Sequence, residues 1–102
     1  MSKLAALCLL SVVYGEARGE PEEGKQAVAS VVLNRSRDSG KTICEVTKEK
    51  GQFRPSRPPK NFSFALRLNS PIEGATYFRN YPGKWGRLRF LGKIGGHYFY
   101  GK

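Results

Sequence analysis

An α+β fold is what the sequence predicts, with helices in the first half of the chain and a small antiparallel sheet in the second. At 102 residues the chain is long enough for a single domain, residues 1–102. Apolar residues recur at helical spacing before residue 50, whereas the alternating, glycine-bounded segments typical of strands follow residue 73. Eleven of the twelve aromatic residues also lie in the second half.

The first expected helix covers residues 3–18. Its apolar side chains recur at helical spacing: Leu4, Leu7, Leu10 and Val13, with Ala5 and Cys8 beside them. Gly19 is the expected end of this helix. Residues 1–13 also resemble the start of an export signal, but no small-x-small cleavage site precedes Tyr14, so a buried helix is favoured over a removed signal.

A second helix is expected to begin at once, with Pro21 at its first position and Glu20 as its N-cap. The two glutamates after the proline face the positive end of the helix dipole. Its buried stripe consists of Ala27, Val28, Val31 and Val32, and the helix ends near Arg37. The short joint between the two helices therefore holds Glu16 and Glu20 at a fixed bend.

Shorter elements are expected to follow. A third helix begins near Ile43 and is closed by Gly51, and the proline-rich stretch 52–62 is an extended loop. Residues 62–68 are interpreted as a helical turn rather than a strand. The remaining segments are a strand within 74–80, a turn at 81–87 and one or two strands within 89–102.

Charge is distributed unevenly along the chain. Residues 1–50 carry eight basic and seven acidic side chains (+1), whereas residues 51–102 carry ten basic side chains and only Glu73 (+9), which together give +10. A basic, aromatic surface suits a polyanion such as nucleic acid, acidic lipid or bacterial cell wall. Two cysteines, Cys8 and Cys44, and one histidine do not match a zinc ligand set, so no metal or other cofactor is expected. Whether the cysteines pair is left open.

Glu16, in the stretch YGEARGE, is the candidate for acid catalysis. A carboxylic acid that protonates a leaving oxygen near neutral pH needs a raised pKa. Glu16 lies in the last turn of an apolar helix, where desolvation and the negative end of the helix dipole both raise the pKa of a carboxyl group. On these residues alone, a solvated glutamate paired with Arg18 or Lys3 is the favoured alternative. Glu20 is explained as a helix cap and is otherwise an assisting group.

No second catalytic carboxylate is evident. The other candidates belong to polar helix ends, turns or solvent-facing positions: Asp38, Glu45, Glu49 and Glu73. Glycosidases with two catalytic carboxylates need them on opposite sides of the scissile bond. A mechanism with a single acid therefore suits this chain better than a paired one.

The candidates for glycan binding combine aromatic rings, which offer an apolar body and a polar tip, with amide side chains. They are Asn34, Gln52, Phe53, Tyr77, Trp85, Tyr98 and Tyr100. For the tyrosines and the tryptophan, a place in the core of the sheet is an equal alternative. Phe78 and Phe99 are assigned to that core, and His97 is expected to be a hydrogen-bonded structural residue.

The stretch YGEARGEPEEGKQAVASVVLNRSR resembles the opening motif of the SleB/CwlJ family of bacterial cell wall hydrolases, GEARGEP–x–x–G–x–x–AVA–x–V–x–LNR. Later pieces of the family pattern recur in order: ICEV, GQF, GATYF, Trp85 after Pro82, and KIGGHYFY. The resemblance extends from about Leu4 to Tyr100, and its first block is the most specific. The segment between GQF and GATYF is shorter than in the family, so substrate contacts from that segment are not carried over to this chain.

The resemblance implies a lysozyme-like α+β fold and cleavage of the MurNAc–GlcNAc bond of peptidoglycan. It implies a lytic transglycosylase, in which the substrate's own 6-hydroxyl attacks the anomeric carbon and leaves a 1,6-anhydro product. Glu16 is then the general acid and base, and one carboxyl group suffices. The expected partner is the glycan strand of the bacterial wall, bound by a monomer with no obligate protein partner and no specific nucleic acid.

Two other functions stay open. A hydrolytic muramidase would use water in place of the 6-hydroxyl, with Glu20 assisting. A basic module that binds nucleic acid or membrane would use the same positive surface without catalysis. High charge, small size and the lack of a clear export signal favour a phage-type lysin, which would accumulate in the cytoplasm and reach the wall by assisted release, over a spore protein.

Overall fold

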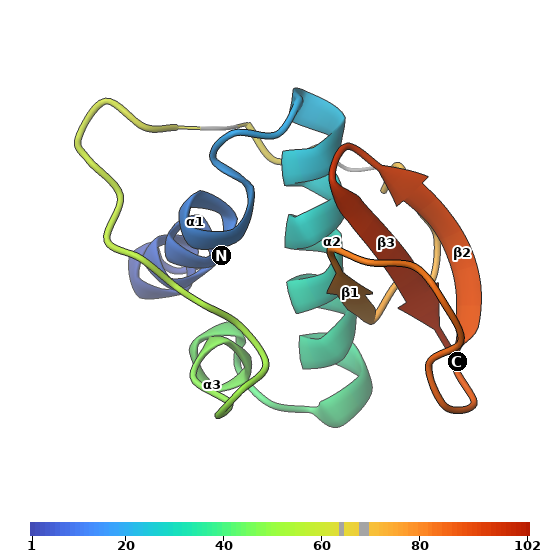
Figure 1. Ribbon diagram of the computed structural model, residues 1–102. Coiled ribbons are helices and arrows are strands. Elements are labelled where there is room, and N and C mark those ends of the chain that lie inside the picture. Colours follow the sequence, from blue (N-terminus) through green and yellow to red (C-terminus); the bar gives the residue numbers. More distant parts are fainter. Residues whose placement is uncertain (64, 68–69) are drawn as a thin grey trace.

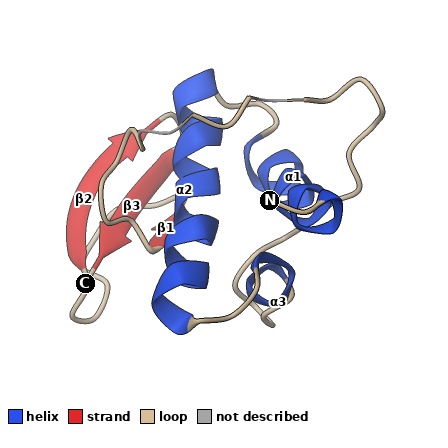
Figure 2. Ribbon diagram, turned by 180° about the vertical axis from the view of Figure 1, so that it is seen from behind, coloured by secondary structure: helices blue, strands red, loops and turns tan. Residues whose placement is uncertain are grey.

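The computed structural model describes residues 1–63, 65–67 and 70–102, in which a group of helices precedes a small sheet (Figure 1). The helices are α1 (Lys3–Ala17), α2 (Glu22–Ser39) and α3 (Ile43–Thr47), and the strands are β1 (Tyr77–Arg79), β2 (Arg89–Ile94) and β3 (His97–Gly101). α2 lies between the sheet on one side and α1 and α3 on the other (Figures 1 and 2). The expected α+β class is confirmed.

α1 buries only the face of its second half. Its buried residues are Leu9, Val12, Val13 and Ala17, which form one core with Ala27, Val28, Val31 and Val32 of α2. The stripe predicted for α2 is therefore confirmed. The stripe predicted for α1 is wrong at its start, because Leu4 and Leu7 are 66% and 54% exposed. None of the described helices has the length and apolar character that a bilayer span requires.

Glu20 is not the cap of α2, contrary to the prediction. The helix begins one residue later than expected, so the capping position falls on Pro21, which makes no side-chain hydrogen bond to the helix. The Glu20 carboxylate instead accepts a hydrogen bond from the backbone N–H of Gly96, 2.6 Å away in the turn between β2 and β3. The joint between the first two helices is thereby tied to the C-terminal hairpin.

The sheet is antiparallel throughout, with β3 between β1 and β2. Tyr77 pairs with Tyr100 across β1 and β3, and Ile94 pairs with His97 next to the turn of the β2–β3 hairpin. Phe99, at the centre of β3, is fully buried in the same core as the valines of α1 and α2. The strands predicted within 74–80 and 89–102 are confirmed, although β1 is shorter than expected.

α3 is also shorter than predicted. It begins with a capping box, in which the Thr42 hydroxyl accepts from the Glu45 N–H and the Glu45 carboxylate accepts from the Thr42 N–H. It ends at Thr47, and the chain then turns through Gly51, whose φ of 76° places it in the left-handed region.

The helical turn predicted for residues 62–68 is wrong for the residues that the structure describes there. Residues 62, 63 and 65–67 are loop, while 64 and 68 lie outside the described residues. The side chain of Gln26, buried in α2, donates to the carbonyl of Ala65 and accepts from the N–H of Arg67 at 2.9 Å. The buried Gln26 amide thus supplies hydrogen-bond partners for the backbone of Ala65 and Arg67, which a helix would otherwise supply from within itself.

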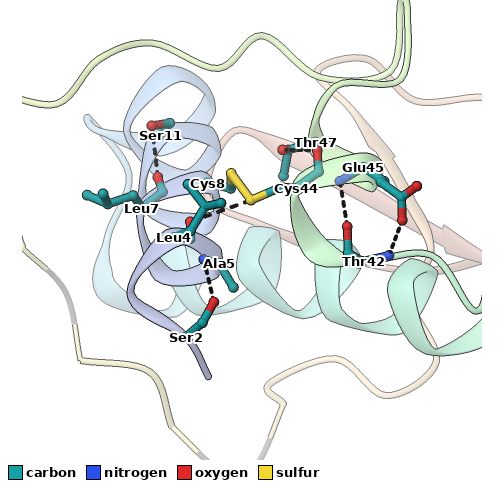
Figure 3. The surroundings of a disulfide bond; sticks show 10 residues. All are labelled: Ser2, Leu4, Ala5, Leu7, Cys8, Ser11, Thr42, Cys44, Glu45 and Thr47. Atoms are coloured by element: carbon teal, nitrogen blue, oxygen red, sulfur yellow. Dashed lines mark hydrogen bonds between the residues drawn. A yellow bond between two sulfur atoms is a disulfide. The ribbon is translucent and has the colours of Figure 1, made fainter.

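The two cysteines are joined. Cys8 of α1 and Cys44 of α3 form a disulfide, with their Cα atoms 5.3 Å apart (Figure 3). The bridge links elements that are 36 residues apart in the sequence and fixes α3 against α1. The question left open by the sequence is therefore settled in favour of a bridge.

We expect the replacement of both cysteines by serine to lower the free energy of unfolding by about 3–4 kcal/mol, the chain-entropy value for a loop of this length. Urea denaturation measures it. Each single replacement should be as destabilising as the double one, since either removes the whole bridge. Reduction of the wild-type protein should give the same midpoint as the double variant, and a midpoint insensitive to reductant would contradict the prediction.

Candidate active site

A cavity of about 680 Å³ opens beside the C-terminal end of α1. We call it the Glu16 cavity. Three parts of the chain supply its walls: the end of α1, the loop after α3, and the sheet with the loop after β1. The lining residues are Gly15, Glu16, Gly51, Gln52, Phe53, Arg54, Phe78, Arg79, Asn80, Tyr81, Trp85 and His97.

Glu16 is partly buried at this cavity, and its burial raises the pKa of its carboxyl group. The backbone N–H and the positive charge of Arg54 oppose part of that rise. The direction predicted from the sequence is confirmed. Near neutral pH, a raised pKa leaves more of this carboxyl group in the protonated form that an acid catalyst needs.

The alternative to a catalytic role for Glu16 was an ion pair with Arg18 or Lys3, and the described residues do not form it. Within the described part of the chain, no salt bridge joins Glu16 to Lys3 or Arg18. The Arg18 guanidinium instead lies 4.8 Å from the centre of the Tyr14 ring and donates to the Tyr14 carbonyl at 3.4 Å. Glu16 is therefore directed to the cavity without a basic side chain of its own helix as a partner.

Gly15 lets the loop after α3 lie directly against α1. The Ser56 N–H donates to the carbonyl of Ser11 at 3.0 Å, so residues 54–56 run along the helix. A Cβ atom on residue 15 would overlap the carbonyl oxygen of Arg54. This close approach places Arg54 beside Glu16, where it influences the carboxyl group.

Three of the residues predicted to bind glycan line the Glu16 cavity: Gln52, Phe53 and Trp85. Phe53 is buried, with its ring 6.2 Å from that of Phe78. Trp85 is partly exposed and packs edge-on against Tyr77 and Tyr100, at 5.6 and 5.2 Å. Phe53, Phe78 and Trp85 thus contribute apolar rings to the lining of the cavity that Glu16 also lines.

The other four predicted residues lie outside the Glu16 cavity. Asn34 donates to the carbonyl of Ala75 at 2.8 Å, so its amide holds the segment before β1. Tyr100 is buried and donates its hydroxyl to the Gly83 carbonyl at 2.7 Å. Tyr77 lies beneath the Arg35 guanidinium at 4.8 Å, and Tyr98 lines a separate, apolar cavity of about 530 Å³.

His97 and Phe78 line the Glu16 cavity, although purely structural roles were predicted for both from the sequence. His97 is 9% exposed, lines the cavity, and packs edge-on against Phe78 at 4.9 Å. Its Nδ1 has no hydrogen-bond partner among the described residues, so the expectation of a hydrogen-bonded histidine is wrong for this atom. Burial lowers the pKa of the imidazole, and the nearby Glu20 carboxylate opposes the change.

Few charged side chains line the Glu16 cavity. Among the described residues that line it, Glu16 is the single carboxylate, while Arg54 and Arg79 are the basic groups. Glu20, held by Gly96, does not line it. In the described ranges, no three His, Cys, Asp or Glu side chains gather closely enough to hold a metal ion. The arrangement suits proton transfer by one acid to a ligand that carries negative charge.

Comparisons with known proteins agree with this fold and motif. A family model described as Cell Wall Hydrolase matches residues 19–100. Among solved structures, the catalytic domain of the germination-specific lytic transglycosylase SleB from Bacillus anthracis superposes with a TM-score of 0.75 at 28% identity, over 98% of this chain and 96% of that one.

Two curated spore cortex-lytic enzymes also match, one from Oceanobacillus iheyensis and one from Bacillus subtilis. Each is 67% identical to this chain over 27 residues, which is 26% of the chain. The match spans only 10% and 9% of the lengths of those relatives. The structural similarity, in contrast, covers almost the whole fold and supports the lysozyme-like architecture.

Proposed function

Because the chain belongs to the cell wall hydrolase family, we propose that it cleaves the MurNAc–GlcNAc bond of peptidoglycan with Glu16 as general acid and base. The observation that carries the proposal is the position of Glu16: of the carboxylates in the described chain, it alone lines the large cavity, and its pKa is raised. The similarity to a lytic transglycosylase domain favours the transglycosylase outcome.

The proposed reaction uses one carboxyl group twice. Protonated Glu16 donates its proton to the glycosidic oxygen, the bond from that oxygen to the anomeric carbon breaks, and positive charge develops on the sugar ring. The Glu16 carboxylate then takes the proton from the 6-hydroxyl of the same MurNAc residue. The 6-oxygen bonds to the anomeric carbon, which closes the 1,6-anhydro ring and returns Glu16 to its protonated form.

The basic residues of the cavity support a wall-derived substrate. Arg54 and Arg79 line it, and the peptide stems of peptidoglycan carry carboxylates that a positive surface attracts. The Cys8–Cys44 bridge supports action outside the reducing cytosol. We therefore place the enzyme at the bacterial wall when it acts.

The product distinguishes the transglycosylase from a hydrolase. Digestion of purified peptidoglycan in water labelled with heavy oxygen should release fragments that end in 1,6-anhydro-MurNAc and carry no label. A hydrolase would instead leave a reducing MurNAc end, heavier by one labelled water. Mass spectrometry of the fragments separates the two, and labelled reducing ends as the main product would overturn the transglycosylase proposal.

A non-enzymatic basic module makes a different prediction. It would bind DNA or anionic vesicles tightly and with strong salt dependence, and it would release no fragments from the wall. The family match and the acid at the cavity favour the enzyme over this alternative.

A further inference from the structure

The loop that follows β1 forms one wall of the Glu16 cavity. Asn80, Tyr81 and Trp85 of this loop line the cavity, as does Arg79, the last residue of β1. Tyr81 is 57% exposed, so its ring is available to a ligand. Trp85 was predicted from the sequence to bind glycan, whereas no role was predicted for Arg79.

The Arg79 side chain holds the loop by its carbonyl groups. Its Nε donates to the carbonyl of Tyr81 at 3.2 Å, and its Nη2 donates to those of Gly83 and Lys84 at 2.8 and 3.4 Å. The Tyr100 hydroxyl also donates to the Gly83 carbonyl, which fastens the same point to β3. One guanidinium thus satisfies three backbone groups of a loop that belongs to no helix or strand.

The same guanidinium also contacts the aromatic rings. It lies 4.2 Å from the centre of the Tyr81 ring, 4.5 Å from that of Trp85 and 5.2 Å from that of Tyr100. A cation over an aromatic face is attracted by the ring quadrupole. Only a planar group with several donors can contact these rings and bond the carbonyls at once, which a lysine ammonium cannot do.

We propose that Arg79 is a positioning residue for glycan binding, which folds the loop so that Tyr81 and Trp85 form the sugar-stacking wall of the Glu16 cavity. This inference rests on the proposed function. A different role, in which Arg79 serves only as a positive charge for the acidic peptide stems, would need no particular side-chain shape. Replacement by lysine separates the two roles, because it keeps the charge and removes the planar donor set.

We expect Arg79→Lys to raise the KM for peptidoglycan fragments about tenfold, with little change in kcat, since the acid is untouched. Arg89→Lys is the matched control, because Arg89 is exposed on β2 and does not line the cavity. The control should keep the wild-type KM. Equal KM values for the two variants would overturn the inference.

Trp85 gives a second readout that does not depend on turnover. It is the only tryptophan in the chain, so the fluorescence of the protein reports on this loop. In a Glu16→Gln background, GlcNAc–MurNAc oligosaccharides should change the Trp85 emission, and Arg79→Lys should weaken this binding about tenfold. Arg79→Lys should also shift the emission of the free protein, as Trp85 loses its packing against the guanidinium.

These outcomes keep the two proposals apart. A wild-type protein that cleaves peptidoglycan, together with an Arg79→Lys variant of unchanged emission and affinity, would refute the positioning role alone. A wild-type protein that releases no fragments would refute the proposed function, whatever the Arg79 variant does to the fluorescence.

Discussion

Glu16→Gln is expected to lower the rate of peptidoglycan cleavage by about 10²–10⁴-fold or more, because glutamine keeps the size and polarity of the side chain but has no acidic proton. Fragment release from purified wall measures the effect. The fold should persist, since a neutral amide replaces a carboxyl group whose neutral form is already favoured by burial.

The pH dependence follows from the same carboxyl group. Because burial raises the pKa of Glu16, the acid stays protonated above the ordinary range of glutamate, and cleavage should decline only as the pH rises through this raised pKa. Glu16 also makes the stability of the fold depend on pH in the same direction. Its stabilising contribution is fully present below the pKa that Glu16 has in the unfolded chain, and it is lost as the pH rises through the raised pKa of Glu16 in the folded protein. Glu16→Gln should remove this loss of stability at high pH.

Glu20→Gln is the control for these experiments. Its amide oxygen can still accept the hydrogen bond from Gly96, so we expect a smaller loss of rate and an unchanged shape of the pH profile. A Glu16→Gln variant that cleaves at the wild-type rate would contradict the assignment of the acid. The same would hold if Glu20→Gln abolished cleavage while Glu16→Gln did not.

Gly15→Ala is expected to destabilise the protein by about 1–3 kcal/mol, although the same change inside a helix is ordinarily stabilising by about 0.5–1 kcal/mol. The added Cβ would overlap the Arg54 carbonyl and would lie 3.0 Å from the Ser56 nitrogen. Both are backbone atoms, which cannot swing aside as the end of a flexible side chain does. The loop must move away from α1, and the surroundings of Glu16 move with it.

Urea denaturation and fragment release together test this prediction, and activity should fall at least about tenfold as residues 54–56 are displaced. Gly19→Ala is the matched control, because a Cβ there would meet nothing within 4 Å. It should leave stability and cleavage nearly unchanged. A Gly15→Ala protein that is more stable than the wild type would show that the loop is not held against the helix.

The sequence was informative where a local pattern determines the structure. The spacing of valines and alanines identified the buried face of α2, and one or two strands were predicted within residues 89–102, where β2 and β3 lie. The apolar helix before Glu16 was enough to predict the direction of its pKa shift. Each of these features depends on neighbours within a few positions in the chain.

Features that join distant segments could not be predicted. Nothing local indicates that Gln26 serves the backbone of the loop at residues 65–67, or that Glu20 bonds Gly96 rather than its own helix. The one sequence feature that pointed to a close contact at the hairpin turn was the pair of glycines before His97. Gly95 has a φ of 59°, in the left-handed region that favours glycine, and a Cβ there would also overlap the Glu20 carboxylate. The turn that Gly95 forms with Gly96 leads directly to His97, which lines the cavity.

The hydrogen bond between Glu20 and Gly96 spans 76 positions in the chain, and this separation has a consequence for when the enzyme becomes active. Closing so long a loop costs entropy before any contact rewards it, so such contacts form late in folding. A nascent chain that has produced Glu16 but not yet the hairpin has an acid without a cavity. The Glu16 cavity is therefore complete only after β3 has docked, because His97 of that strand is part of its lining.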